Sequence, residues 1–299
     1  MTAPDTGTHE DREALEHQLA GLRPRLHRYC ARMVGSVIDG EDVVQDTLLK
    51  AFAALDQPKP IANPESWLFR IAHNSALDFL RRRNRADALR SSEDPEMLVD
   101  PVNPVDDPEI VAASLTTIMR LPVGQRSSVI LMDVLGYRLG EICNIMDCSL
   151  PAAKSALNRG RTRLRELARE PEGTALPVLG ERDRSLLWAY IDRFNARDFT
   201  AIRDMLADEV RLDLVNKVRK SGRDQVSTYV ENYADVQDWQ FVLGFVERRP
   251  AIIVRDPSEP SGAPAYFILL EWSAEKVLNI RDFRYARYAI ESAHLQLAN

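Results

Sequence analysis

The sequence has few cysteines and few histidines, three and five among 299 residues. Cys30, Cys143 and Cys148 do not make a disulfide framework, and with no histidine near the last two, a zinc site is not predicted. No apolar run approaches the ~20 residues of a membrane span, and the N-terminus lacks the basic start and apolar stretch of a signal peptide. We therefore expect a cytoplasmic protein that has no membrane contact and binds no metal or cofactor.

The composition is that of a folded protein: 45% of the residues are hydrophobic and 28% are charged, which are ordinary globular values. At ~100–200 residues per domain, the length predicts two or three domains. The formal net charge is -6, yet positive charge gathers in two short segments. Local charge of this kind, rather than the net value, decides what docks on a surface.

Two linkers divide the sequence into three segments. Residues 13–90 have a helical pattern, with apolar positions at 44, 48, 52 and 55 and a second helix starting near Glu65. Residues 91–108 hold six acids, four prolines and no basic residue, which predicts an extended acidic linker. Residues 109–170 are helical again, and 171–180 form a softer linker. On composition alone, the acidic linker is a solvated spacer.

The last segment, 181–299, has a different texture. Helices are expected near 183–195 and 200–206. Alternating, β-branched and aromatic stretches then predict strands within 209–215, 239–247, 251–256, 265–273 and 277–288. The loop "DPSEPSGAP" fits a hairpin connection. The segment is therefore an α+β domain behind two all-α segments.

The stretch 139–167 predicts two helices around a tight turn. The first covers 139–146, Asp147 and Cys148 make the turn, and Ser149 is an N-cap. Ala153, Leu157, Gly160, Leu164 and Leu167 form the buried stripe of the second helix. Between positions 154 and 163 the second helix carries four positive charges and no acid: Lys154, Arg159, Arg161 and Arg163. In a helix-turn-helix the second helix enters the major groove, whereas a solvated amphipathic helix with a basic face is the simpler alternative.

A second basic cluster lies between Trp67 and Arg90, a stretch that holds six arginines and only two aspartates. Aromatic rings interleave with these arginines, an arrangement that suits unstacked single-stranded bases. For the rings of Trp67 and Phe79, core packing is the stronger expectation. His73 and Asn74 can hold a base, although a lone histidine is more often a satisfied surface residue.

Four stretches in order resemble an extracytoplasmic-function (ECF) sigma factor of bacterial RNA polymerase. "DGEDVVQDTLLKAFAAL" resembles its region 2.1–2.2, "ESWLFRIAHNSALDFLRRRNR" its regions 2.3–2.4, "LPVGQRSSVILMDVLGYRLGEICNIM" the start of region 4, and "DCSLPAAKSALNRGRTRLREL" the −35 recognition helix. The resemblance implies a non-enzymatic protein whose partners are core RNA polymerase and promoter DNA. It also implies two helical domains, region 2 over 13–90 and a helix-turn-helix region 4 over 109–170. By the same resemblance, the linker 91–108 would be a mimic of nucleic acid directed toward the RNA exit path, with the solvated spacer as the alternative.

Functional residues follow from the resemblance by position. The polymerase-docking helix holds Asp42, Val43, Gln45 and Asp46. The −10 strand would be engaged by Asn74, Arg81, Arg82 and Arg83. The −35 element would be read by Ser149, Lys154, Ser155, Asn158 and Arg159. The chain departs from the family at Ala156, which replaces a usual arginine, and Gly160 weakens the recognition helix by up to about 1 kcal/mol relative to alanine.

Residues 181–299 resemble a SnoaL-like cone fold, and the resemblance implies that this domain tunes the sigma function through an intramolecular contact with the sigma domains. A catalytic or ligand-binding pocket is the alternative for this domain, with Asp213 as the best inward carboxylate and a strand-end surface position as its simpler interpretation. Tyr229, Tyr233, Trp239, Phe267 and Trp272 could line such a pocket, but core packing is the better expectation. For the whole chain the alternative is a helix-turn-helix regulator with a ligand-sensing C-terminal domain.

Overall fold

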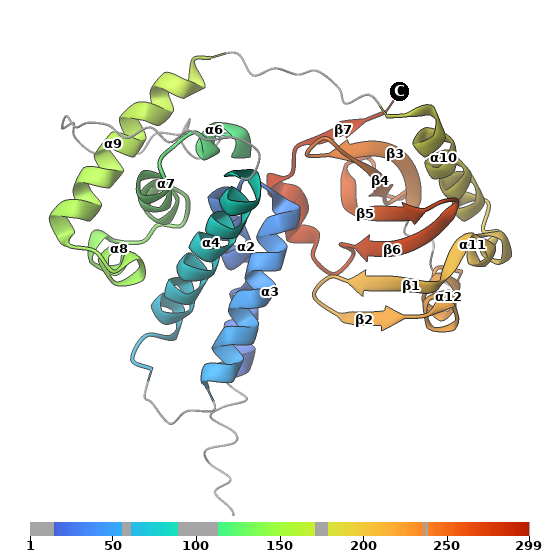
Figure 1. Cartoon of the computed structure of the whole chain (residues 1–299), viewed down its shortest axis with the longest axis horizontal. Helices are drawn as coiled ribbons and strands as arrows, with labels where there is room; N and C mark the ends of the chain where they lie inside the picture. Colours follow the sequence, from blue (N-terminus) through green and yellow to red (C-terminus); the bar gives the residue numbers. More distant parts are fainter. Residues whose placement is uncertain are drawn as a thin grey trace, which may run out of the picture. The chain divides into compact units, whose positions relative to one another are not determined.

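The computed structural model describes residues 15–55, 61–88, 113–170, 179–234, 236 and 239–298. The chain forms two compact units, which divide between residues 172 and 173 of the sequence (Figure 1). The predicted acidic linker 91–108 and residues 171–178 of the second linker lie outside the described residues. The two helical segments that the sequence separates belong to one unit, and the α+β segment forms the other.

Three helices make the first half of the helical unit: α2 (Arg23–Val34), α3 (Val37–Ala54) and α4 (Pro64–Ala88), after helical residues 15–21. Gly35 ends α2 with φ 79°, and Ser36 caps α3 by accepting the Asp39 amide at 3.1 Å. A Cβ on Gly40 would lie 2.6 Å from the Ala31 backbone, so glycine lets α2 and α3 pack closely.

The second half contains α6 (Leu115–Met119), α7 (Val123–Val129), the π-helix η1 (Ile130–Val134), α8 (Leu139–Met146) and α9 (Leu150–Ala168). The predicted helix bounds and the Ser149 cap are confirmed; the Ser149 hydroxyl accepts the Ala152 amide at 3.4 Å. All five residues of the predicted stripe are buried. A Cβ on Gly160 would lie 2.7 Å from Cγ2 of Val129, so the glycine that weakens α9 lets it approach α7.

A buried polar cluster joins the two halves. The Tyr29 hydroxyl lies 2.8 Å from Nδ1 of His73 and 2.9 Å from the Ser127 hydroxyl, which links α2 and α4 to α7. Arg126, beside Ser127, donates to the Met33 carbonyl of α2 at 2.5 Å. The surface position expected for His73 is wrong, because the residue is only 6% exposed. This burial lowers its pKa to about 4.

A second set of contacts lies near the ends of α2 and α4. Arg25 pairs with Glu65, whose carboxylate also accepts the Tyr137 hydroxyl at 2.6 Å. Arg70 of α4 pairs with Asp147, in the turn between α8 and α9, at 3.2 Å. These contacts and the buried cluster explain why one compact unit forms from two sequence segments. Of the helices in the described part of the chain, none is long and apolar enough to cross a membrane.

The second unit is an α+β fold with one mixed sheet. Its helices are α10 (Glu181–Asn195), α11 (Phe199–Met205) and α12 (Arg223–Glu231), with the 3-10 helix η2 (Arg287–Ser292). Its strands are β1 (Leu206–Leu214), β2 (Val218–Ser221), β3 (Gln240–Val246), β4 (Arg249–Arg255), β5 (Pro264–Ser273), β6 (Lys276–Asp282) and β7 (Leu295–Leu297). The sheet order is β2-β1-β6-β5-β4-β3-β7. Only β1 and β6 pair in parallel among these strands; the other pairs are antiparallel.

The five predicted strands are confirmed in position, and "DPSEPSGAP" joins β4 and β5 as a hairpin connection. The helix α12 and the strands β2 and β7 were not predicted, and the strand expected to reach 288 ends at Asp282. The core lies where α10 meets the sheet: Phe194 stacks on Phe241 with ring centroids 4.4 Å apart and meets Tyr233 and Trp239 edge-on. The unit thus has the α+β fold class expected for the domain (Figure 1).

Candidate nucleic-acid interface

The exposed side of α9 carries the polar residues predicted to read DNA. Lys154 is exposed, and Ser155, Asn158 and Arg159 are half-buried. Lys154 and Asn158 are four residues apart, as are Ser155 and Arg159, so the four side chains share one side of the helix. The opposite side is the buried stripe against α7. The helix thus offers a short polar surface above an apolar base.

Two of the four basic residues between 154 and 163 are paired with acids, contrary to the expectation of uncompensated charge. Arg161 is 4% exposed, and its guanidinium pairs with Asp133 of η1, with Nε 3.0 Å from Oδ2. Arg163 pairs with Glu166 at 2.8 Å. Of the four, Lys154 and Arg159 have no ion pair with any residue that the structure describes. Among residues 154–163, the positive charge available for docking is therefore on these two.

An apolar residue stands at the start of the same surface. Leu150, the first residue of α9, is 55% exposed. It lies four residues before Lys154, so it is on the same side of the helix and adds an apolar contact at the N-terminal end of that surface. Sequence reasoning did not single it out, although its place just after the Ser149 cap and outside the apolar stripe was a usable signal.

Helix α4 presents a second basic surface, whose arginines differ in their exposure and in their contacts. Asn74, Arg81 and Arg82 are exposed. Arg81 pairs with Asp78 at 3.3 Å. Arg83 is half-buried, donates to the Val34 carbonyl at 2.8 Å and lies over the Phe79 ring at 5.9 Å. Arg83 therefore anchors α4 to α2, Asn74 and Arg82 are open to a ligand, and Arg81 is exposed but paired with Asp78.

The polymerase-docking residues predicted on α3 separate into a buried and an exposed set. Val43 is 2% exposed and packs in the core. Asp42 is exposed, Gln45 and Asp46 are half-buried, and Asp46 pairs with Lys50 at 2.8 Å. Leu49 lies on the same side of the helix and is 63% exposed. The structure thus brings together an acidic and amide surface with one large apolar residue, which the sequence reasoning missed.

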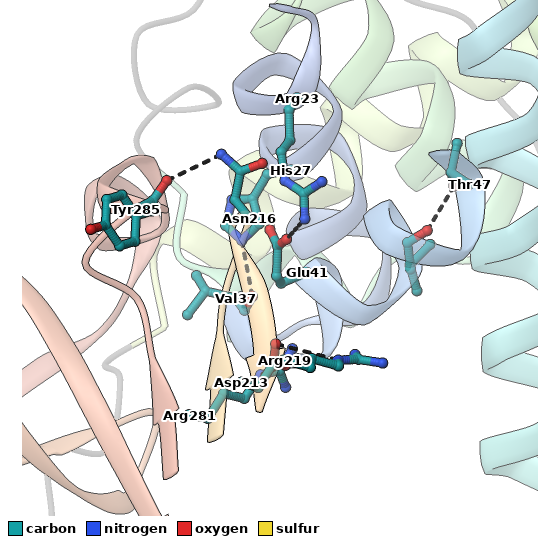
Figure 2. A network of polar contacts seen from close by, with 11 residues as sticks. Arg23, His27, Val37, Glu41, Thr47, Asp213, Asn216, Arg219, Arg281 and Tyr285 are labelled. Carbon is teal, nitrogen blue, oxygen red and sulfur yellow. Dashed lines mark hydrogen bonds and ion pairs between the residues drawn. The ribbon is translucent and has the colours of Figure 1, made fainter. Parts of the chain in front are cut away.

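The N-terminal end of α3 is held by buried polar contacts with α2. Glu41 is 1% exposed and pairs with Arg23, and Nε2 of His27 lies 2.9 Å from the Val37 carbonyl (Figure 2). Because a buried carboxylate needs a charged partner, the Arg23 pair fixes the start of the helix that carries Asp42.

In the α+β unit, Asp213 is not the inward carboxylate that we expected. The core-facing residues of β1 are Val210, Leu212 and Leu214, and Asp213 lies on the other side of the strand. Its carboxylate pairs with Arg219 at 3.4 Å and with Arg281 at 3.6 Å (Figure 2). Asp213 therefore occupies the simpler of its two expected positions, on the outward side of the strand near its end.

The buried carboxylate belongs to Asp282, at the end of β6, which is 0% exposed. It accepts hydrogen bonds from the Tyr229 hydroxyl, from the Tyr233 hydroxyl at 2.8 Å and from the Arg284 amide at 2.7 Å. Burial raises its pKa. The Tyr266 hydroxyl accepts from the Arg284 guanidinium at 2.8 Å. The network thus joins α12, β5 and the end of β6 through buried side chains.

The expected core role is confirmed for four of the five aromatic residues proposed as pocket or core. Tyr229, Tyr233, Trp239 and Phe267 are at most 6% exposed, whereas Trp272 is half-buried. Trp272 packs edge-on against Tyr190 with ring centroids 6.4 Å apart. Tyr229, Tyr233 and Trp239 belong to the main core of the unit, whereas Phe267 stacks on Phe283 with ring centroids 4.2 Å apart.

Two family models match the helical unit. Residues 20–86 match the model described as Sigma-70 region 2, and residues 114–164 match the one described as Sigma-70, region 4. The matches follow the order that the sequence predicted. They cover α2, α3 and α4 in the first case and α6 to α9, up to residue 164, in the second.

Curated relatives match the same part of the chain. The RNA polymerase sigma factor CarQ of Myxococcus xanthus is 32% identical over 160 residues, which cover 54% of this chain and 92% of CarQ. The ECF RNA polymerase sigma factor SigG of Mycobacterium tuberculosis is 29% identical over 212 residues, 62% of this chain and 57% of SigG. The chain therefore spans little more than half of the length of SigG. A solved structure of the ECF sigma factor SigJ of Mycobacterium tuberculosis has 18% identity and a TM-score of 0.36, over 89% of this chain and 95% of SigJ.

Proposed function

The chain belongs to the ECF RNA polymerase sigma factors, and we propose that it binds core RNA polymerase and directs transcription initiation at specific promoters. The observation that carries the proposal is the surface of α9, where Lys154 and Arg159 stand without an ion pair among the described residues beside Ser155 and Asn158. We take the cytoplasm, with the polymerase, as its place of action. The sigma domains would cover 13–90 and 109–170, and a regulatory domain 181–299.

The recognition helix would read the −35 element from the major groove. Residues at the N-terminal part of the second helix reach base edges in a helix-turn-helix. Lysine, arginine and asparagine in bidentate contact with a base each contribute about 1–3 kcal/mol of discrimination. Ser149 and Lys154 lie at this end, and Arg159 lies further along, where a cation can neutralise a phosphate.

Helix α4 would engage the −10 strand through Asn74, Arg81 and Arg82. An exposed amide can hydrogen-bond a base that has left the stack, and the two exposed arginines supply charge for the backbone. Arg83 would contribute indirectly, since its bond to the Val34 carbonyl fixes α4 against α2. The polymerase would dock on α3 through Asp42, Gln45, Asp46 and Leu49. In this set the apolar Leu49 supplies burial and the polar residues supply specificity.

Promoter binding would require the two halves of the helical unit to separate. Elements named for positions −10 and −35 are about 25 base pairs apart, or about 85 Å at ~3.4 Å per base pair. In the packed unit Arg70, one turn from Asn74, touches Asp147, two residues from Ser149. The two DNA-reading surfaces therefore lie far closer than 85 Å. Spin labels on α4 and α9 should report a short distance in the free chain and a long one in the polymerase complex; an unchanged distance would contradict this step.

The C-terminal unit would regulate the sigma domains through an intramolecular contact. The arrangement of Asp282 and its tyrosines supports a protein-contacting module, because those side chains fill the interior that an enzyme would use for substrate. The outward ion pairs of Asp213 also speak against acid–base chemistry at that carboxylate. The alternative of a ligand-sensing regulator predicts a DNA-binding protein that forms no stoichiometric complex with core polymerase.

Run-off transcription with core RNA polymerase tests the proposal. The full chain is compared with a chain ending near Gly180, on a pool of genomic fragments from the source organism. Specific transcripts from either chain establish initiation, and their ratio gives the sign of C-terminal control. If both folded chains are silent and neither co-purifies with core polymerase, the ligand-sensing regulator is the better interpretation.

A further inference from the structure

The turn of the helix-turn-helix places two of the three cysteines of the sequence against each other. Cys143 lies in the last turn of α8, and Cys148 lies between that helix and the Ser149 cap of α9. Both are free thiols and half-buried. The third cysteine, Cys30, is 0% exposed in the core of the unit. The chain therefore holds one accessible thiol pair and one inaccessible thiol.

The backbone of the turn explains the proximity. Asp147 has φ 54° and ψ 49°, a left-handed conformation, and the Cys148 amide donates to the Cys143 carbonyl at 3.1 Å. This six-residue closure at a helix C-terminus brings the side chains of its first and last residues into contact. In most proteins that contact is between two apolar side chains. Here both residues are cysteines, and the Cys143 side chain is near enough to help raise the pKa of the Cys148 thiol.

We propose that Cys143 and Cys148 form a reversible disulfide when the protein meets hydrogen peroxide, and that this bond weakens binding of α9 to −35 DNA. The second half of the proposal rests on the function proposed above. The first half rests only on the geometry of the turn. The oxidant class is a peroxide, and a dithiol reductant restores the free thiols.

The reaction balances within the pair. One sulfur attacks hydrogen peroxide, so that an S–O bond forms, the O–O bond breaks and one water leaves, giving a sulfenic acid. The second sulfur attacks the sulfenic sulfur, so that the S–S bond forms, the S–O bond breaks and a second water leaves. Two thiols lose two electrons and two protons, and one peroxide is reduced to two waters.

The surroundings of Cys148 set the rate. Burial raises the pKa of its thiol, and the neighbouring Cys143 and Asp147 add to that shift. Since the thiolate is the reactive form, oxidation should be slow at neutral pH and faster at pH 9. The pair would thus respond to sustained peroxide and not to brief exposure.

The consequence for DNA binding follows from the short S–S bond. A disulfide holds its sulfurs about 2.05 Å apart, closer than two thiols in contact. Drawing Cys148 toward α8 displaces the adjacent Ser149, whose hydrogen bond to the Ala152 amide is already 3.4 Å long. Loss of that cap frees the first turn of α9, which begins the DNA-reading surface. Oxidation should therefore lower −35 affinity about fivefold or more, or roughly 1 kcal/mol.

Thiol counting on the full chain tests the disulfide. After peroxide, catalase and alkylation in denaturant, the wild-type chain should take up one label in place of its three. The Cys143→Ser variant cannot form the disulfide, so peroxide should not remove its two labels together. The Cys30→Ser variant keeps only the proposed pair, so it should lose both of its labels. Intact mass should fall by about 2 Da without dimer formation. Three labels on the wild-type chain, at a peroxide dose that oxidises a free dithiol, overturn the proposal.

Affinity for a −35 duplex tests the consequence. The duplex is selected from a random pool by the reduced chain, and binding is measured for reduced, oxidised and re-reduced protein. Affinity should fall on oxidation and return with reductant, while Cys148→Ser should be insensitive to peroxide. A formed disulfide with unchanged affinity overturns the regulatory role. If the reduced chain selects no sequence, the proposed function fails, and the thiol count still decides the modification site.

Discussion

The Tyr29 hydroxyl and Nδ1 of His73 lie 2.8 Å apart in the interior of the helical unit, and the Ser127 hydroxyl is 2.9 Å from the same Tyr29 oxygen. These three side chains come from α2, α4 and α7, so one buried hydrogen-bond cluster spans both sigma regions. Each group is buried, and an unsatisfied polar group there would cost about 1–3 kcal/mol. The cluster therefore couples the packing of the two regions to the protonation state of His73.

His73 should make the stability of the helical unit fall in acid. Burial lowers its pKa from the usual 6.5 to about 4, so the unfolded chain takes up the proton first as the pH falls. The stabilisation is complete above pH 6.5 and is lost between pH 6.5 and 4, amounting to at most about 3 kcal/mol. Chemical denaturation of His73→Gln should show a flatter pH dependence. His17→Gln, at an exposed histidine, serves as the control and should behave like the wild type.

Arg159→Ala should weaken −35-dependent initiation by about tenfold or more while leaving the unit folded, because a base or phosphate contact is worth about 1–3 kcal/mol. Arg163→Ala is the matched control on the same helix, since Arg163 pairs with Glu166 at 2.8 Å. Promoter affinity at moderate salt and thermal unfolding are the measurements. Equal losses from both variants would contradict the assignment of Arg159 to the DNA.

Leu49→Glu should weaken the complex with core polymerase, because it places a charge where an exposed apolar residue is expected to be buried on docking. Leu297→Glu is a comparable change at a residue that is 41% exposed in the other unit, and it should leave polymerase binding unchanged. Pull-down with purified core polymerase measures both. A Leu49→Glu chain that binds as well as the wild type would move the docking surface away from α3.

Asp282→Asn should be tolerated, and Asp282→Leu should destabilise the α+β unit. Burial holds the pKa of Asp282 above its unfolded value, so the folded state retains the proton and the contribution of this carboxyl to stability falls as the pH rises. Asparagine does not titrate, so the stability of the Asp282→Asn variant relative to the wild type should increase with pH. Leucine leaves the Tyr229 and Tyr233 hydroxyls without this acceptor, at about 1–3 kcal/mol each. Thermal unfolding across pH gives the comparison.

Local features of the sequence predicted the recognition helix well. The Ser149 cap, the turn at Asp147 and the apolar stripe depend on residues three to seven positions apart, and the structure confirms them. The helix α12 was not predicted, because its local sequence favours a strand. Its residues "RDQVSTYVE" include β-branched and aromatic side chains that favour strands, and it forms a helix only because tertiary packing overrides that preference.

Pairings across the fold could not be predicted from local patterns. Arg161 meets Asp133 from a position 28 residues away, and a buried carboxylate at Asp282 depends on tyrosines more than 45 residues earlier. A one-residue change of register exchanges the two sides of a strand, so the sequence pattern predicts an inward Asp213 while the structure places it on the other side of β1. The burial of His73 likewise depends on α7, which the sequence places behind the 91–108 segment.

The absence of a side chain at Gly160 has a consequence for reprogramming this protein. Because Val129 and the Gln125 carbonyl occupy the space where a Cβ would lie, the position of α9 along α7 is fixed by backbone contact and not by the residues on its outer side. Lys154, Ser155, Asn158 and Arg159 can therefore be exchanged in combination without moving the helix. A library restricted to those four positions would sample promoter preference on a constant scaffold.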